Sequence, residues 1–132
     1  MELQIATVET DLFAHREVKP HFINDCCFGE DFAEWLKQRL ANVSGFESSD
    51  PIQEDYGWGL WVTRGKDKFW IALSYVGEGP TEAPAQWVIS VTRPTSLNIV
   101  RRLFSKPDVT TMEALQARIR RELESTAGIS VL

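Results

Sequence analysis

Residues 57–76 constrain the fold more than any other stretch of the chain. Gly57 to Val62 alternates small and bulky residues, Gly65 to Lys68 has turn-forming composition, and Phe69 to Val76 is a second bulky run. Alternation at period two on both sides of a short, glycine-containing turn is typical of a β-hairpin. The sequence therefore predicts two antiparallel strands at the centre of the chain.

A turn centred on residues 66 and 67 fixes the expected register of this hairpin. The large apolar residues then meet across the two strands as Trp58 with Tyr75, Leu60 with Leu73, and Val62 with Ile71. A buried sheet face requires such matching, because a slip of one residue turns every side chain to the opposite face. We therefore expect this face to point into the core.

Further elements are expected on both sides of the hairpin. Residues 3–8 and 86–92 alternate like strands. Residues 9–24 are expected to form a loop, with a second short strand near Phe22-Ile23 as an alternative. Apolar stripes at helical spacing predict helices over 30–42 and 111–125. A short helix is expected over 97–104, and the apolar tail 129–132 is too short to assign.

This order of elements predicts the α+β class. We expect one domain, 1–132, with an antiparallel sheet of three to five strands. Both main helices are expected on one face of the sheet, the face that carries Trp58, Leu60, Leu73 and Ile89.

The opposite face of the sheet is an unusual surface, because small residues surround two tryptophans. By the same register it carries Gly57, Gly59, Trp61, Thr63, Trp70, Ala72, Ser74, Val88 and Ser90. Trp61 is expected to oppose Ala72, with Trp70 on the diagonal. Three interpretations remain open: a second core layer under a helix or the N-terminal segment, a homodimer packed sheet to sheet, or a groove for a ligand or partner.

Charge and composition narrow the class of protein. The formal net charge is -5, which argues against general nucleic-acid binding. Residues 1–62 hold 12 Asp/Glu against 4 Lys/Arg, so an acidic surface offered to a basic partner is one interpretation. The only cysteines, Cys26 and Cys27, are adjacent and do not form a secreted-protein disulfide framework. No apolar run is long enough to span a membrane and no export signal is recognisable, so a cytoplasmic location is expected.

The residues that carry chemistry form few known patterns. Glu54 and Asp55 are neighbouring carboxylates, suited to a solvated loop edge or to a basic group of a partner. The spacing of His21, Cys26 and Cys27 matches no metal-binding pattern, so neither a metal nor a cofactor is expected. The motifs of dinucleotide-binding proteins, P-loop proteins, α/β-hydrolases and zinc proteases are also missing. The stretch 54–59 resembles small bacterial α+β proteins, a likeness that assigns no functional residue.

These observations favour a non-enzymatic binding or interaction protein. The expected site combines the acidic loop 47–55 with aromatic residues of the sheet, namely Glu54, Asp55, Tyr56, Trp61 and Trp70. A protein with a basic surface is the expected partner, of the toxin-neutralising or regulatory kind, and a homodimer is a further possibility. The alternative is a small hydrolase or transferase that uses Cys27 or Glu54 with His21.

Overall fold

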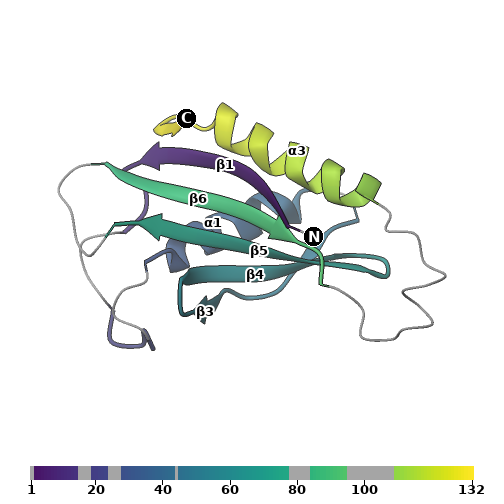
Figure 1. The fold of residues 1–132 in the computed structure, drawn as a ribbon, viewed down its shortest axis with the longest axis horizontal. Coiled ribbons are helices and arrows are strands. Elements are labelled where there is room, and N and C mark those ends of the chain that lie inside the picture. The colour runs from purple at the N-terminus through teal and green to yellow at the C-terminus, as the bar shows by residue number, and fades with distance from the viewer. Residues whose placement is uncertain (1, 15–18, 24–27, 44, 78–83, 95–108) are drawn as a thin grey trace.

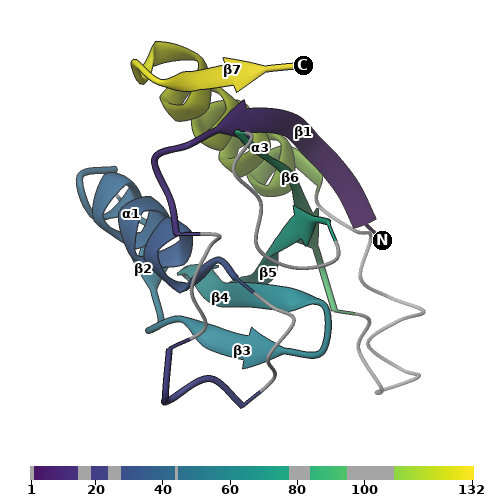
Figure 2. The same cartoon turned by 90° about the vertical axis from the view of Figure 1, so that its left-hand side faces the viewer.

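In the residues that the structure describes, an antiparallel sheet curls around two helices (Figures 1 and 2). This computed structural model describes residues 2–14, 19–23, 28–43, 45–77, 84–94 and 109–132. The helices are α1 (Glu30–Ala41) and α3 (Val109–Ser125). The strands are β1 (Glu2–Thr10), β2 (Glu47–Ser48), β3 (Ile52–Glu54), β4 (Gly57–Arg64), β5 (Asp67–Val76), β6 (Ala85–Thr92) and β7 (Ile129–Val131). The α+β class is confirmed.

The sheet is larger than the sequence predicts. Within the described ranges, seven strands pair in the order β2-β4-β5-β6-β1-β7, with β3 also beside β4, instead of three to five. The additional strands are β2, β3 and β7, which have only two or three residues each. Alternation cannot be recognised over so few residues, because one period already takes two.

Other predicted elements have mixed outcomes. The strands expected over 3–8 and 86–92 and the helices over 30–42 and 111–125 are confirmed, with small shifts at their ends. The short strand expected near Phe22-Ile23 is wrong, because the described residues 19–23 form a turn. The helix expected over 97–104 lies outside the described residues.

The hairpin register differs from the predicted one by two residues. Gly65 has φ +59 and takes the first position of a two-residue turn, with Arg64 pairing Asp67 on either side. The observed pairs are Trp58 with Leu73, Leu60 with Ile71, Trp61 with Trp70, and Val62 with Phe69. A two-residue turn favours glycine at this position, and the predicted turn centre was therefore one residue too late. Because the shift is even, each side chain keeps its predicted face.

One apolar core fills the concave side of the sheet. The inner-face residues of β4, β5 and β6 pack with the apolar stripes of both helices, and most of them are completely buried. On the helices these residues include Phe32, Leu36 and Leu40 of α1 and Met112, Leu115, Ile119 and Leu123 of α3. On this core side of the sheet, α1 packs against β4 and β2, and α3 packs against β1 and β7.

Part of the open edge of β1 is closed by α3. A bulge between Gln4 and Ala6 interrupts the pairing of β1 with β6, and β7 pairs only with the last three residues of β1. Beyond β7, the Gln116 amide donates a hydrogen bond to the carbonyl of Gln4 at 3.3 Å. The Arg120 guanidinium donates another to the carbonyl of Ile5 at 3.0 Å. Side chains of a helix thus satisfy backbone acceptors that a further strand would otherwise use.

Candidate functional site

The outer face of the sheet carries three aromatic side chains in a row. Trp61 and Trp70 face each other directly across β4 and β5, with ring centroids 5.0 Å apart at 59°. The predicted diagonal arrangement of the two indoles is wrong for the same reason as the register. The indole Nε1–H of Trp70 donates a hydrogen bond to the Tyr56 hydroxyl at 2.6 Å. We refer to Tyr56, Trp61 and Trp70 as the aromatic strip.

A glycine allows the strip to lie against the sheet. A Cβ atom on Gly59 would lie 2.2 Å from the Trp70 ring and 2.6 Å from the carbonyl oxygen of Ile71. The Trp70 ring therefore crosses from β5 over the backbone of β4, in the direction of Tyr56. Gly59 leaves the room for this crossing, which no larger residue could provide without moving the indole or the strand.

The strip remains accessible on its outer side. Trp61 and Trp70 are partly exposed, and the Tyr56 side chain is 48% exposed. Both described helices pack on the opposite side of the sheet (Figure 2). The interpretation of this face as a second core layer under a helix therefore does not hold for α1 or α3.

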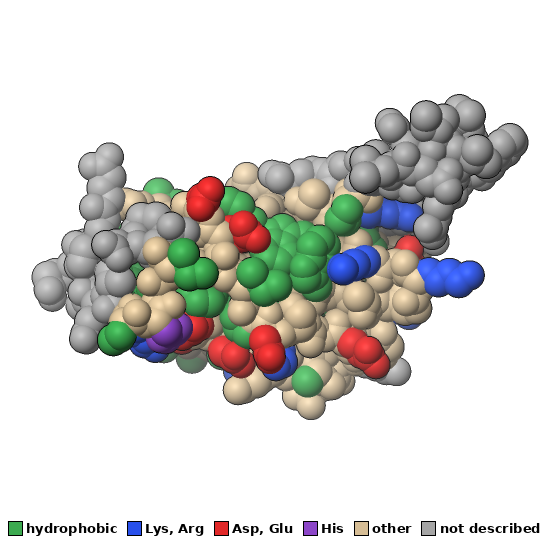
Figure 3. Space-filling model, turned by 90° about the horizontal axis from the view of Figure 1, so that it is seen from below, with side chains coloured by type: hydrophobic (Ala, Val, Ile, Leu, Met, Phe, Trp, Pro, Cys, Tyr) green, Lys and Arg blue, Asp and Glu red, His purple; other side chains and the backbone are tan. Residues whose placement is uncertain are grey.

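Charged side chains lie at both ends of the strip. At one end, the exposed residues Glu54 and Asp55 directly precede Tyr56. At the other end, the Lys68 ammonium lies 4.3 Å from the centre of the Trp61 ring, a distance at which a cation interacts with the ring face. Seen from below, the molecule has a hydrophobic patch at its centre, with acidic side chains to its upper left and below it and basic side chains to its right (Figure 3).

The predicted acidic loop 47–55 is in part an edge of the sheet. Residues 47–48 and 52–54 pair with β4 as β2 and β3, and only 49–51 and the turn at Asp55 lie between strands. Ser49 keeps the segment between β2 and β3 next to β4, because its hydroxyl accepts a hydrogen bond from the Trp61 backbone N–H at 2.9 Å. The segment therefore presents its carboxylates from a fixed backbone.

Asp50 within this segment has a cationic partner. The Lys37 ammonium of α1 donates a hydrogen bond to the Asp50 carboxylate at 2.5 Å. This hydrogen bond and the positive charge hold the pKa of Asp50 below its ordinary value. The same hydrogen bond raises the pKa of Lys37. Glu54 and Asp55 are the carboxylates of this segment that directly precede the strip in the chain.

The residues of the predicted enzymatic site are only partly described. The imidazole Nε2 of His21 lies 2.6 Å from the Glu30 carboxylate, and its ring is 6.5 Å from the Trp58 ring. Sequence reasoning did not find the Glu30 partner, which comes from the first turn of α1, nine residues away. Cys27 lies outside the described residues, so the catalytic alternative stays a prediction.

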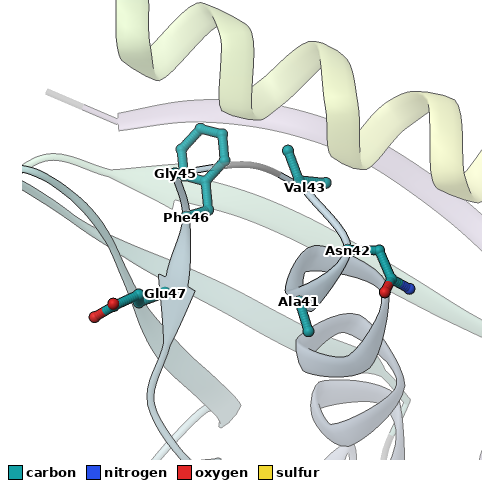
Figure 4. A pocket seen from close by; sticks show the side chains of 6 residues that line it. All are labelled: Ala41, Asn42, Val43, Gly45, Phe46 and Glu47. Atoms are coloured by element: carbon teal, nitrogen blue, oxygen red, sulfur yellow. The ribbon is translucent and has the colours of Figure 1, made fainter.

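A shallow pocket of about 370 Å³ lies at the C-terminal end of α1 (Figure 4). It is lined by Ala41, Asn42, Val43, Gly45, Phe46 and Glu47. Glu47 is the one ionisable residue among these six, and its side chain points away from Phe46 and Val43 (Figure 4). The pocket thus lacks the converging polar groups of a small-molecule site. Within the described part of the chain, no three His, Cys, Asp or Glu side chains gather to hold a metal ion.

Comparisons with protein-family models, with curated proteins and with solved structures find no match to this chain. In the described residues, no helix is long and apolar enough to cross a membrane.

Proposed function

We propose that this chain is a non-catalytic interaction protein that binds another protein through the aromatic strip and the carboxylates next to it. The observation that carries the proposal is the row of exposed Tyr56 and partly exposed Trp61 and Trp70 on a sheet face that neither described helix covers. Tryptophan and tyrosine are enriched at protein interfaces, because each offers a large apolar surface together with one hydrogen-bonding group.

The strip is ordered before any partner binds, which favours its use as a contact surface. The hydrogen bond from Trp70 to Tyr56 and the contact of Trp61 with Trp70 restrict the rotamers of all three rings. Less side-chain entropy is lost on binding when the contacting groups are already fixed. Rigid aromatic residues of this kind are common among the residues that dominate binding energy.

The charge of the site favours a partner with a basic surface. Glu54 and Asp55 are exposed at the end of the strip, and the whole chain has a net charge of -5. Attraction between opposite charges accelerates association, and added salt screens this attraction and reduces the acceleration. Regulatory or toxin-neutralising partners would meet this description.

A pull-down with single variants tests the proposal. The wild-type chain, Trp61→Ala, Trp70→Ala and Asp55→Asn are immobilised separately, and the captured proteins are quantified by mass spectrometry. We expect the same partner to be depleted at least about tenfold by either tryptophan variant, and less by Asp55→Asn. The expected loss with Asp55→Asn should shrink at high salt.

Two matched variants on other surfaces serve as controls. Leu132→Ala removes an exposed apolar side chain, and Glu113→Gln removes an exposed carboxylate on α3. Both should retain the partner at the wild-type level. If the strip variants retain every captured protein as well as wild type does, the proposal is wrong.

A further inference from the structure

The aromatic strip has a direction, because its two ends carry opposite charge. Lys68 lies on the ring of Trp61 at one end, and Tyr56 follows directly after Glu54 and Asp55 at the other. Between them, Trp61 contacts Trp70, and Trp70 bonds Tyr56. The surface therefore runs from a cation through three aromatic rings to two carboxylates.

The charge around each end agrees with this direction. The sheet end near the β4–β5 turn carries Arg64, Lys66, Lys68 and Arg93 against Glu47 and Asp67, a net charge of +2. Asp67 is paired with Arg93 at 3.7 Å, which leaves Lys66 and Lys68 as the cations of the turn nearest the strip. The opposite end, at the turn between β3 and β4, carries the two carboxylates. In Figure 3, most of the basic side chains in view lie to the right of the central hydrophobic patch, and acidic side chains lie to its upper left and below it.

We infer that the occupant of this surface is a second copy of the chain, packed face to face about a two-fold axis at Trp70. The inference rests on the proposed function and names the partner: the basic surface that fits the acidic end is the basic end of another copy. A two-fold interface uses the same patch on both subunits, so the patch has to be complementary to itself.

The order of residues along the strip meets this condition. With the axis at Trp70, the strips run in opposite directions, and Lys68 of each copy lies over Asp55 and Glu54 of the other. Trp61 of one copy meets Tyr56 of the other. Each attractive contact occurs twice by symmetry, whereas two strips packed in the same direction would bring like charges together.

The sheet surface around the strip allows close approach. The neighbouring outer-face positions of β5 and β6 carry small or short side chains, namely Ala72, Ser74, Val88 and Ser90. Sheets pack face to face at about 10 Å when no bulky polar side chain separates them. The three aromatic rings then become the centre of the interface, and the charged ends become its rim.

Sedimentation equilibrium of the full chain tests the inference directly. Over about 1 μM to 1 mM, the wild-type chain should change from monomer to dimer. Trp70→Ala should raise the dissociation constant at least about tenfold, because it removes the centre of the interface. Lys68→Glu and Asp55→Lys should each raise it about tenfold at low salt, since symmetry repeats each repulsive contact.

Mixing the two charge variants separates this interface from any other. In a mixed dimer of Lys68→Glu with Asp55→Lys, both rim contacts are attractive again. We therefore expect the mixture to dimerise about as well as wild type, although each variant alone is weakened. Arg121→Glu and Glu113→Lys make the same charge changes on exposed α3 positions and should have no effect. Circular dichroism confirms that every variant is folded.

Each other outcome overturns the inference. A wild-type chain that stays monomeric throughout the range does not use the strip for self-association. A dimer that is insensitive to Trp70→Ala and to the charge variants uses another surface. In both cases the pull-down still decides the proposed function by itself, because a different partner lost with the strip variants would support that function without self-association.

Discussion

The two faces of the β4–β5 hairpin are built from alternate residues of the same strands, and they differ in what holds them in place. On the inner face, Leu60, Val62, Phe69 and Ile71 are completely buried under the helices. On the outer face, Trp61 and Trp70 are larger, yet they contact mainly each other, Tyr56 and Lys68. The comparison teaches that residue size alone does not identify a core, because the largest side chains of β4 and β5 lie on both faces.

The largest expected effect is a difference in stability between variants at two neighbouring positions, one on each face. Leu60→Ala should lower the free energy of unfolding by about 2–5 kcal/mol, because it leaves a cavity in a closely packed core. Trp61→Ala removes a larger side chain but should cost about 1 kcal/mol, because the position is partly exposed. Urea denaturation of both variants measures the difference. Equal losses would mean that the outer face is as tightly packed as the inner one.

Gly59→Ala should have the next largest effect, because the glycine leaves the room in which the Trp70 ring lies against the sheet. The added methyl group meets both the indole and the carbonyl of Ile71, so we expect a loss of about 1–3 kcal/mol. In NMR spectra, the indole N–H resonance of Trp70 should also move, since the ring leaves the Tyr56 hydroxyl. Gly65→Ala is the control for the Trp70 resonance, because a Cβ atom there meets no atom within 4 Å; its own stability loss, about 1–2 kcal/mol, comes from the backbone strain at φ +59. An unchanged Trp70 resonance in Gly59→Ala would contradict the described position of the ring.

Tyr56→Phe sharpens the comparison within the outer face itself. The variant keeps the ring but removes the acceptor of the Trp70 hydrogen bond, so stability should fall by about 1 kcal/mol or less. Hydrogen exchange at the Trp70 indole should become faster. If exchange remains as slow as in the wild type, the hydrogen bond does not protect this indole.

The smallest effect is expected at the edge of the sheet, where Lys37 and Asp50 form an exposed ion pair. The pKa of Asp50 is lowered from 3.8, so its contribution is present above that pH and is lost as the pH falls through the lower, folded-state value. The pKa of Lys37 is raised from 10.5, so its contribution is present below that pH and is lost as the pH rises through the folded-state value. Between these limits, Asp50→Asn should shift the unfolding midpoint less than Leu60→Ala, Trp61→Ala, Gly59→Ala or Tyr56→Phe, and added salt should reduce even this shift. A pH titration of unfolding with both proteins provides the measurement.

The sequence predicted the faces of the hairpin but not its register. Alternation assigns Leu60 to one face and Trp61 to the other, whatever the pairing, because any even shift preserves the faces. Which residues meet across the strands depends on the turn, and the φ of Gly65 decides that. The direct contact of Trp61 with Trp70 could have been found by giving glycine the first position of a two-residue turn.

The sequence predicted the aromatic residues of the candidate site but not the contacts between their side chains. Tyr56, Trp61 and Trp70 were expected as binding residues, and the structure brings the three together. Lys68 on the Trp61 ring was not expected, although its position next to the turn on the outer face follows from the same alternation. The hydrogen bond between Tyr56 and Trp70 depends on a ring that crosses to another strand, and no sequence pattern records such a crossing.

The hydrogen bonds from Gln116 and Arg120 to the bulged part of β1 affect how readily the chain aggregates at high concentration. An extended segment of another chain can join a sheet only where backbone acceptors and donors await partners. At Gln4 and Ile5 the carbonyls are already engaged by α3, and the displaced backbone no longer matches a straight strand. Fibril growth by strand addition therefore finds no template along this stretch for as long as α3 stays folded.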